Sequence, residues 1–394
     1  MSDGLGARRP GRFHLQNIDD RVSIMGNMLD YICWRGDLPW TCAPFCEVDS
    51  LILSQLSMLF WEEVLGRGES KTLADLRPLM EDKQVSAGFT EDNDRKLLET
   101  AAGCPRFGSI LLSDHVSLFD EGTGLQFSAV TMHLPDGTLF VSYRGTDNTL
   151  VGWKEDLRMT FSLPVPAQAA AAEYLRDIAG RCGGFLRVGG HSKGGNLAMY
   201  ASAAADARTR KRILQVYNHD GPGFKDGAEA RRIYRKIDDK LLFFVPQSSV
   251  FGLLLDHPCS HQTVKSDGFG IWQHDPYSWQ VEGSRFVRME ALTKSSVFVE
   301  SAIRKWLSGV DDEDRRLFVE TMFYVLASTD ARSFGRDLWT SLLQHPAAFI
   351  SSIRDIDARS KARIAGVLTK LAGAAFSRDA LEARSDGADG DGSC

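Results

Sequence analysis

The stretch Phe-Leu-Arg-Val-Gly-Gly-His-Ser-Lys-Gly-Gly-Asn-Leu-Ala, residues 185–198, decides the fold class of this chain. Its apolar start, 185–188, predicts a strand, and the small residues of 194–205 predict a helix. Between them lies a Gly-x-Ser-x-Gly pattern, in which a serine occupies a tight strand-to-helix turn in a strained backbone conformation. The flanking glycines let the strand and the helix approach each other without Cβ collisions. The pattern indicates a nucleophile elbow with Ser192 at its tip.

Strands and helices alternate on both sides of this turn. Residues 125–133 and 138–143 have the composition of strands, and the Leu-Pro-Asp-Gly between them predicts a hairpin. The other predicted core elements are an Ala-rich helix at 167–182 and strands at 213–218, 241–245 and 262–265. This alternation predicts an α/β fold, of the α/β-hydrolase type, with a mostly parallel sheet covered by helices on both faces.

Helical periodicity dominates the two ends of the chain. Near the N-terminus, apolar residues recur at helical spacing from Val48 to Val64, with Asp49 and Ser50 as the expected N-cap. Residues 67–100 are also expected to be helical, with a helix start at 90–92. In the C-terminal part, helix faces are formed by Val299, Ile303 and Trp306, by Leu317, Thr321 and Tyr324, and by Leu338, Leu342 and Leu343.

We therefore divide the chain into four parts. Residues 1–100 form an N-terminal leader and helical region packed on the core, 101–288 the α/β-hydrolase core, and 289–378 a C-terminal helical subdomain. Residues 379–394 are expected to be disordered, because so polar and glycine-rich a segment cannot bury enough apolar surface to order itself.

The bulk composition is that of a soluble globular protein. Of the 394 residues, 43% are hydrophobic and 25% charged, with a net charge of −6, so no basic field for nucleic acid is expected. No run approaches the roughly 18 apolar residues of a membrane span, and no apolar h-region follows the first residues. The seven cysteines are irregularly spaced, which favours a reducing compartment over a disulfide framework. We expect a cytoplasmic protein without a transmembrane segment.

An acyl-transfer site needs two oxyanion donors as well as a nucleophile. The backbone N–H of Lys193, at the N-terminus of the helix after the elbow, is the first candidate. The second is Thr146, in the Arg-Gly-Thr-Asp turn at 144–147 that follows a predicted strand. A polar turn after a strand would be ordinary on its own, so the role of Thr146 depends on the elbow.

These motifs resemble the class 3, fungal-type lipases. The shared features, in the same order, are the strand followed by Arg-Gly-Thr, the Trp-x-x-Asp-Leu of 153–157 and the Gly-His-Ser-x-Gly elbow, all within residues 125–205. Beyond them, Val-Tyr-Asn-His-Asp-Gly-Pro-Gly-Phe (216–224), the Val-Pro-Gln-Ser-Ser segment of 245–255 and Gln-His-Asp-Pro-Tyr-Ser-Trp (273–279) resemble the Mbeg-like family. That bacterial lipase-fold family is largely without assigned substrates. The resemblance covers nearly the whole chain before the C-terminal helices and implies the α/β-hydrolase fold.

The serine needs a base, and the usual chain order in this fold is serine, acid, histidine. His257, His261 and His274 qualify by position. We favour His274, since it follows the last predicted strand in a loop-like Gln-His-Asp-Pro segment. His257 and His261 flank Cys259, a spacing that only weakly suggests metal ligands, and His191 is expected to serve packing.

Two aspartates are candidates for the acid that orients the histidine. Asp220 follows the strand at 213–218 in Asp-Gly-Pro-Gly-Phe, which resembles the setting of the acid in pancreatic-type lipases. Asp256 lies nearer the place where class 3 lipases keep theirs. Those lipases have an Asp directly before Val-Pro, however, where this chain has Phe244. We favour Asp220 and keep Asp256 as the alternative.

The residues predict a serine hydrolase that cleaves carboxylic esters or related acyl substrates, lipid or small-molecule, through Ser192, His274 and Asp220. Lys193 and Thr146 would form the oxyanion hole, and no metal or organic cofactor is implied. Thioesterases, acyltransferases and peptidases use the same elbow, because the shape of the pocket selects the acyl acceptor. The alternative from another class is a non-catalytic lipase-fold protein that binds an acyl ligand or a protein partner, which the missing Asp before Val-Pro permits.

Overall fold

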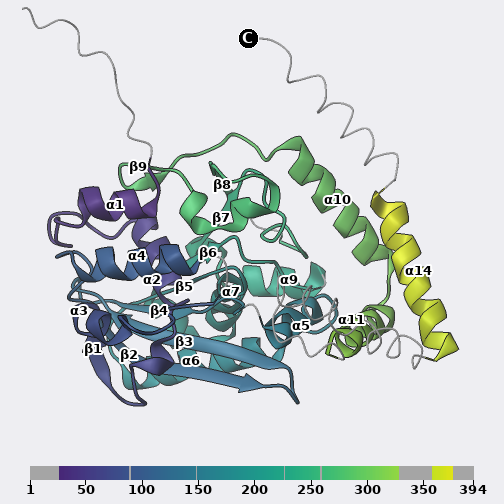
Figure 1. Cartoon of the computed structure of the whole chain (residues 1–394), viewed down its shortest axis with the longest axis horizontal. Coiled ribbons are helices and arrows are strands. Elements are labelled where there is room, and N and C mark those ends of the chain that lie inside the picture. The colour runs from purple at the N-terminus through teal and green to yellow at the C-terminus, as the bar shows by residue number, and fades with distance from the viewer. Residues whose placement is uncertain are drawn as a thin grey trace, which may run out of the picture.

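An eight-stranded sheet runs through the middle of the computed structural model (Figure 1). The strands lie across the sheet in chain order: β1 Ser70–Thr72, β2 Leu111–Asp120, β3 Leu125–His133, β4 Leu139–Tyr143, β5 Leu186–His191, β6 Ile213–His219, β7 Leu241–Pro246 and β8 Gln262–Val264. The structure describes residues 26–87, 90–147, 149–225, 227–257, 260–327 and 357–375. β1 to β4 are antiparallel neighbours, and β4 to β8 are parallel ones. The predicted α/β fold with a mostly parallel sheet is confirmed.

The strands expected from the sequence, β3 to β8, all form, but β1 and β2 extend the sheet beyond the prediction. The pairing register of β2 with β3 shifts between Ser113 and Val116, and Asp114 between them has a φ of 54°. An irregularity of this kind moves the side chains that follow it to the opposite face of the sheet. No single two-residue period therefore runs through β2, and the sequence pattern does not indicate it.

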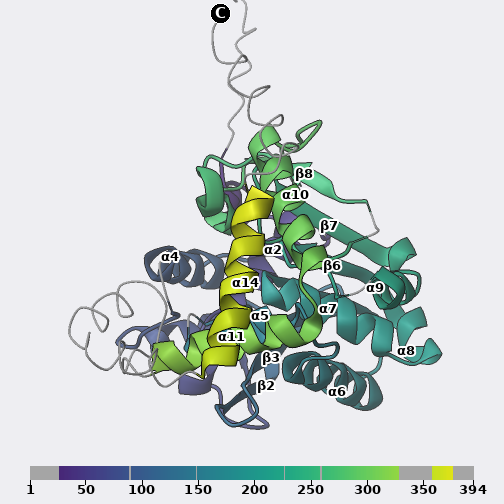
Figure 2. The ribbon, with the colours of Figure 1, turned by 90° about the vertical axis from the view of Figure 1, so that its right-hand side faces the viewer.

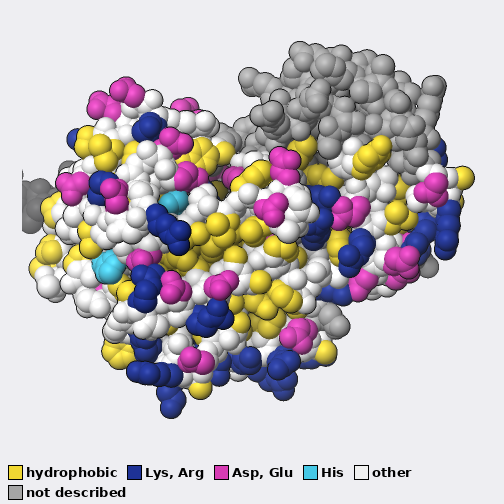
Figure 3. Space-filling model, turned by 90° about the horizontal axis from the view of Figure 1, so that it is seen from below, with side chains coloured by type: hydrophobic (Ala, Val, Ile, Leu, Met, Phe, Trp, Pro, Cys, Tyr) yellow, Lys and Arg dark blue, Asp and Glu magenta, His cyan; other side chains and the backbone are white. Residues whose placement is uncertain are grey.

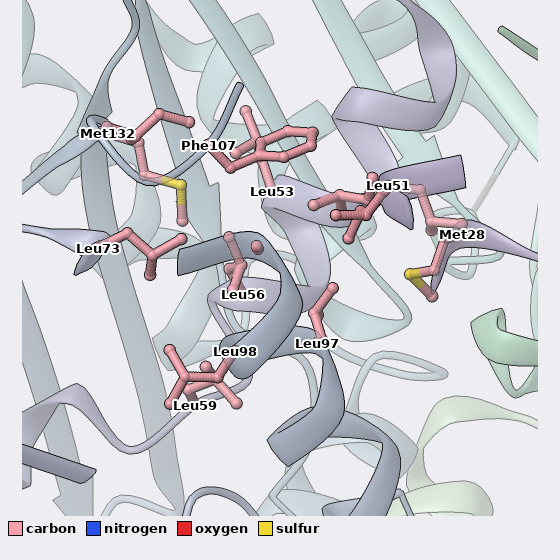
Figure 4. Close-up of a cluster of buried hydrophobic side chains, with 14 of the residues drawn as sticks. Met28, Leu51, Leu53, Leu56, Leu59, Leu73, Leu97, Leu98, Phe107 and Met132 are labelled. Atoms are coloured by element: carbon pink, nitrogen blue, oxygen red, sulfur yellow. The ribbon is translucent and has the colours of Figure 1, made fainter. Parts of the chain in front are cut away.

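Helices cover both faces of the sheet, as predicted. One face carries α1 Met28–Arg35, α2 Glu47–Leu56 and α4 Glu91–Ala102, whose apolar side chains meet in the buried cluster of Figure 4. The other face carries α6 Pro166–Arg181, α7 Lys193–Ala204 and α9 Gly227–Tyr234, while α8 Ala207–Arg212 leads from α7 into β6. Alternation along β4 divides the two clusters, because Phe140 belongs to the first, and Val141 and Tyr143 belong to the second.

Helix α2 begins earlier than expected. Its N-cap is Cys46, and Asp49 and Ser50 lie inside the helix, so their assignment as N-cap residues was wrong. Asp49 accepts a hydrogen bond from the Cys46 N–H at 2.8 Å and pairs with the Arg106 guanidinium at 2.5 Å. The side chains of Asp49 and Arg106 are fully buried, and a buried carboxylate without such partners would be strongly destabilising. A long-range ion pair therefore determines where Asp49 sits in the helix.

The N-terminal helices are shorter than predicted. α2 ends at Leu56 and does not continue to Val64. Residues 67–100 contain β1, the short helix α3 Leu73–Leu76 and a 3-10 turn before α4, whose N-cap Thr90 falls within the helix start predicted at 90–92. β1 forms because it pairs with β2, a contact between distant segments that leaves no local sequence signal.

In the described part of the chain, three helices follow the sheet: α10 Lys294–Gly309, α11 Asp312–Ala327 and α14 Ala358–Ala375. The first two lie where helical periodicity predicted them. The leader, the expected helix face with Leu338, Leu342 and Leu343, and the tail at 379–394 lie outside the described residues. Figure 2 shows α14 lying across α10 and α11. α11 packs on α5 Leu150–Arg158, where Glu320 accepts a hydrogen bond from Arg158 at 2.8 Å.

Within the described part of the chain, no helix is long and apolar enough to cross a membrane. The face seen in Figure 3 mixes acidic and basic side chains around a strip of hydrophobic ones, so neither sign of charge dominates it. Five cysteines in the described ranges are free thiols: Cys33, Cys42, Cys46, Cys104 and Cys182.

Candidate active site

Ser192 lies in the turn between β5 and α7, at the carboxyl edge of the sheet. Its backbone has a φ of 57° and a ψ of −132°, a strained conformation for a residue that carries a side chain. A Cβ on Gly190 would collide with the backbone of Gly194, and a Cβ on Gly194 would collide with the carbonyl oxygen of Tyr143. Both glycines are therefore required by close backbone approach, and the turn has the geometry of a nucleophile elbow.

His274 and Asp220 form a hydrogen-bonded chain with Ser192. The Nε2 atom of His274 lies 3.0 Å from Oγ of Ser192. The Nδ1 atom lies 2.6 Å from Oδ2 of Asp220, which is fully buried directly after β6. Because a carboxylate only accepts, Nδ1 carries the proton and Nε2 is left to accept one from the serine hydroxyl. The structure thus brings together the three residues that the sequence analysis favoured.

Asp256, the alternative acid, does not contact the imidazole. Its backbone N–H donates to the carbonyl oxygen of Phe224 at 3.0 Å, and the N–H of Phe224 donates back at 3.0 Å. Its side chain lines a separate cavity of about 300 Å³ beside α10. Of the two candidate acids, only Asp220 lies within hydrogen-bond distance of His274.

Two further hydrogen bonds hold the Asp220 carboxylate. The Ser249 hydroxyl donates to Oδ1 at 2.5 Å, and the N–H of Gly252 donates to the same oxygen at 3.1 Å. Asp220 has a φ of 54°, a left-handed conformation that Asp adopts more readily than most residues. One carboxylate oxygen is thus held by the segment after β7, and the other faces His274.

The imidazole of His274 packs against two rings. The ring centroid of His191 lies 4.6 Å away, and that of Phe251 lies 4.3 Å away. The Nε2–H of His191 donates to the carbonyl oxygen of His274 at 2.9 Å. Burial lowers the pKa of His191 well below its usual range, so this ring stays neutral beside His274. His191 therefore steadies the loop that carries His274.

His257 and His261 do not line the cleft that contains Ser192. Their rings pack against Phe243, with centroids 5.9 and 6.2 Å from its ring, and burial lowers the pKa of both. Cys259, between them, lies outside the described residues. In the ranges that the structure does describe, no group of three or more His, Cys, Asp or Glu side chains is arranged to hold a metal ion.

Ser192 and His274 open into a cleft of about 330 Å³. Its lining combines apolar and polar side chains: Met58, Ala87, Trp153, Phe251, Trp272 and Pro276, together with Gln55, Thr90, Thr146, Asp156, His191 and Asp275. A concave site with an apolar wall and a few converging polar groups is typical of a small-molecule site.

The two residues predicted to form the oxyanion hole lie next to the serine. Thr146 lines the same cleft, and Lys193 is the first residue of α7, where backbone N–H groups have no partner within the helix. The Lys193 side chain is buried, and its Nζ donates to the carbonyl oxygen of Gln126 at 3.0 Å and pairs with Glu155 at 3.2 Å. Only the backbone of Lys193 can therefore serve as a donor to the cleft.

The hydroxyl of Thr146 donates to Oδ2 of Asp156 at 2.5 Å. Because a hydroxyl has a single hydrogen, the backbone N–H is what Thr146 can offer to an oxyanion. Burial raises the pKa of Asp156 to about 6, while the charge of Lys193 and the Thr146 hydrogen bond oppose this rise. The carboxyl that anchors the Thr146 loop therefore titrates close to neutral pH.

The residues that support the site have no role that could be assigned from the sequence. Asp156 belongs to the Trp-x-x-Asp-Leu motif but received no role, and Ser249 lies in the segment 245–255 noted only as a family resemblance. Ser249 reaches Asp220 from 29 residues further along the chain. No periodicity or spacing signals such a contact, because the fold of the loop after β7 creates it.

The family assignment covers most of this architecture. Residues 101–324 match the Mbeg1-like family, which is more than half of the chain. The chain belongs to the Mbeg1-like family. The matched region includes β2 to β8 and most of α11, and with them Ser192, Asp220 and His274. A comparison with curated proteins found no significant match.

Proposed function

We propose that this Mbeg1-like protein is a serine hydrolase that cleaves carboxylic esters or related acyl substrates, with Ser192 as nucleophile, His274 as base and Asp220 as the orienting acid. The observation that carries the proposal is the chain of two hydrogen bonds, 2.6 and 3.0 Å long, that links Asp220 through His274 to a serine in a strained strand-to-helix turn. Acyl transfer requires this combination of an exposed nucleophile, a base and an oriented tautomer.

In this mechanism, His274 takes the hydroxyl proton of Ser192 at Nε2 while Oγ attacks the acyl carbonyl carbon. The carboxylate of Asp220 keeps Nδ1 protonated and stabilises the imidazolium that forms. His274 then gives its proton to the leaving oxygen, the ester C–O bond breaks, and the acyl group stays on Ser192. Water, deprotonated by the same imidazole, attacks this ester and releases the carboxylic acid and the free serine.

Negative charge develops on the carbonyl oxygen in each half of the reaction and needs donors that are already in place. The backbone N–H groups of Lys193 and Thr146 would supply them, aided by the positive end of α7. The ammonium group of Lys193 takes no direct part, because Gln126 and Glu155 hold it in the interior.

An uncharged acyl group fits the wall of the cleft. Met58, Trp153, Phe251 and Trp272 line it beside Ser192, and apolar side chains stabilise a hydrocarbon chain by removing it from water. The acidic lining consists of Asp156 and Asp275, and burial raises the pKa of both. Among the described residues that line the cleft there is no Lys or Arg, so nothing there would pair with an anionic substrate, which supports esters with neutral acyl and alcohol parts.

A fluorophosphonate probe tests the proposal, because only an activated serine reacts with it. We expect one equivalent of label on the wild type and none on Ser192→Ala. Ser202→Ala, a change at a buried serine within α7, is the matched control and should label like the wild type. Absence of label on the wild type would instead support a non-catalytic protein that binds an acyl ligand or a partner, and label on Ser192→Ala would place the nucleophile elsewhere.

A further inference from the structure

The segment after β7, residues 247–252, contacts the acid, the loop of the base and α10. We propose that Ser249 in this segment is a positioning residue for Asp220, and that α10 holds Ser249 in place through Ser296. The inference rests on the proposed hydrolase function and adds the means by which the acid is kept in its working orientation.

Ser249 and Gly252 saturate one oxygen of the acid. Oδ1 of Asp220 accepts from the Ser249 hydroxyl at 2.5 Å and from the Gly252 N–H at 3.1 Å, and that N–H also lies 3.1 Å from Oγ of Ser249. Asp220 and Ser249 are both buried, so bulk solvent does not compete with the Ser249 hydroxyl for Oδ1. With Oδ1 fixed, the carboxylate cannot rotate about its Cβ–Cγ bond, and Oδ2 stays directed at Nδ1 of His274.

The same segment also holds the loop of the base. The N–H of Ser248 donates to Oε1 of Gln273 at 2.7 Å, and Gln273 directly precedes His274. Nε2 of Gln273 donates in turn to the carbonyl oxygen of Gly268 at 3.0 Å, at the start of that loop. Neighbouring serines of one segment therefore bind the acid and the residue next to the base, which fixes the spacing between them.

The segment itself is held from α10. The N–H of Thr293, the N-cap of α10, donates to the carbonyl oxygen of Gln247 at 2.7 Å, and its hydroxyl lies 2.9 Å from that of Ser248. One turn later, the hydroxyl of the buried Ser296 donates to the carbonyl oxygen of Ser249 at 2.5 Å. Helix α10 is thus linked to the acid by two hydrogen bonds in series, from Ser296 to Ser249 and from Ser249 to the carboxylate of Asp220.

The test is a double-mutant cycle measured on p-nitrophenyl butyrate, with folding checked by melting temperature. Ser249→Ala should lower kcat by about ten- to a hundredfold with KM changed by less than about threefold, since one hydrogen bond to a charged group is lost. In an Asp220→Asn background, the same change should lower kcat by less than about threefold, because its effect passes through the carboxylate. An equal loss in both backgrounds, or no loss in the wild type, overturns the inference.

Ser296→Ala provides the second arm and decides the matter if Ser249→Ala fails to fold. It should lower kcat by about three- to tenfold in the wild-type background only. Ser308→Ala, at an exposed position on the same helix, is the matched control and should leave kcat unchanged. A wild type without esterase activity and without fluorophosphonate label overturns the proposed function and this inference together, whereas an active wild type indifferent to both Ser249→Ala and Ser296→Ala overturns the inference alone.

Discussion

The Nδ1 atom of His274 and the Oδ2 atom of Asp220 lie 2.6 Å apart, although 54 residues separate them in the chain. Asp220 comes directly after β6, and His274 ends the 3-10 turn Gly270–His274 beyond β8. The two therefore meet at the edge of the sheet where the parallel strands β5 to β8 end, which is also the edge that carries Ser192. This shared edge is what allows residues from three separate loops to form one hydrogen-bonded chain.

Replacing the acid tests the first consequence of this contact. Asp220→Asn should lower kcat for a short-chain ester by about a thousand- to ten-thousandfold, because the amide no longer selects the tautomer that accepts the serine proton. Asp256→Asn, the matched change at the other candidate, should alter kcat by less than about threefold, since Asp256 lies beside a separate cavity. Steady-state kinetics on both variants, with melting temperatures as a check on folding, would assign the acid to Asp256 if the order of the losses were reversed.

Local chemistry explains which site residues could be predicted from the sequence. Ser192 stands in a glycine-flanked turn between a strand and a helix, Asp220 directly follows a strand, and His274 lies in a loop-like Gln-His-Asp-Pro segment, so each carries a signal within a few residues. Ser249 and Asp156 carry none, because the folding of the chain brings them to hydrogen-bond partners that lie 29 and 10 residues away. The catalytic roles of all five remain predictions, whereas their contacts are properties of the fold.

The same distinction holds for the fold. The hairpin β3–β4 and the strands β5 to β8 follow from runs of apolar residues bounded by turn residues, and they form as predicted. β1 depends on pairing with β2, and β2 has an irregular register, so neither shows a regular pattern. Asp49 resembles an N-cap residue in the sequence, but its ion pair with Arg106, 57 residues away, explains its place inside α2.

Asp156 should make the folded protein less stable as the pH rises. Burial raises its pKa from 3.8 to about 6, so the folded state binds the proton more tightly than the unfolded state. The stabilisation that results is complete below pH 3.8 and is lost as the pH rises through about 6. Asp156→Asn cannot ionise and keeps an acceptor for Thr146. The melting temperature of this variant minus that of the wild type should therefore be about 2–4 °C larger at pH 8 than at pH 4. An offset that is the same at both pH values would contradict the prediction.

His219 should act in the opposite direction. It is fully buried against Phe244, and burial lowers its pKa to about 3, so the folded state keeps it neutral. Its contribution is fully present above the ordinary pKa of 6.5 and is lost as the pH falls toward 3. His219→Gln, which keeps a donor for Ser50 Oγ, should be less stable at pH 7.5. Between pH 7.5 and pH 4.5, its free energy of unfolding should fall by about 2–3 kcal/mol less than that of the wild type. Denaturant unfolding at the two pH values measures this difference, and parallel losses would show that His219 is not the group responsible.

The aromatic wall of the cleft should determine the preference for acyl length. Trp272 lines the cleft beside His274 while 57% of its surface is exposed, so its ring can cover the outer part of a bound acyl chain. Trp272→Ala should lower kcat/KM for p-nitrophenyl octanoate by about tenfold, because the distal methylene groups lose an apolar contact. For p-nitrophenyl acetate, which has no distal methylene groups, the change should stay within about twofold.

Phe269 is the matched control for Trp272. It lies three residues earlier on the same loop and is 88% exposed, but it does not line the cleft. If the acyl chain is recognised inside the cleft, Phe269→Ala should leave the ratio of octanoate to acetate kcat/KM unchanged for monomeric substrates, while Trp272→Ala lowers it. Equal effects of the two changes would mean that the loop influences turnover through its conformation, and no effect of either would place the acyl chain against other residues of the lining, such as Met58 and Trp153. The ratio is the decisive quantity, because a general disturbance of His274 lowers kcat/KM for both substrates by the same factor, which cancels in the ratio.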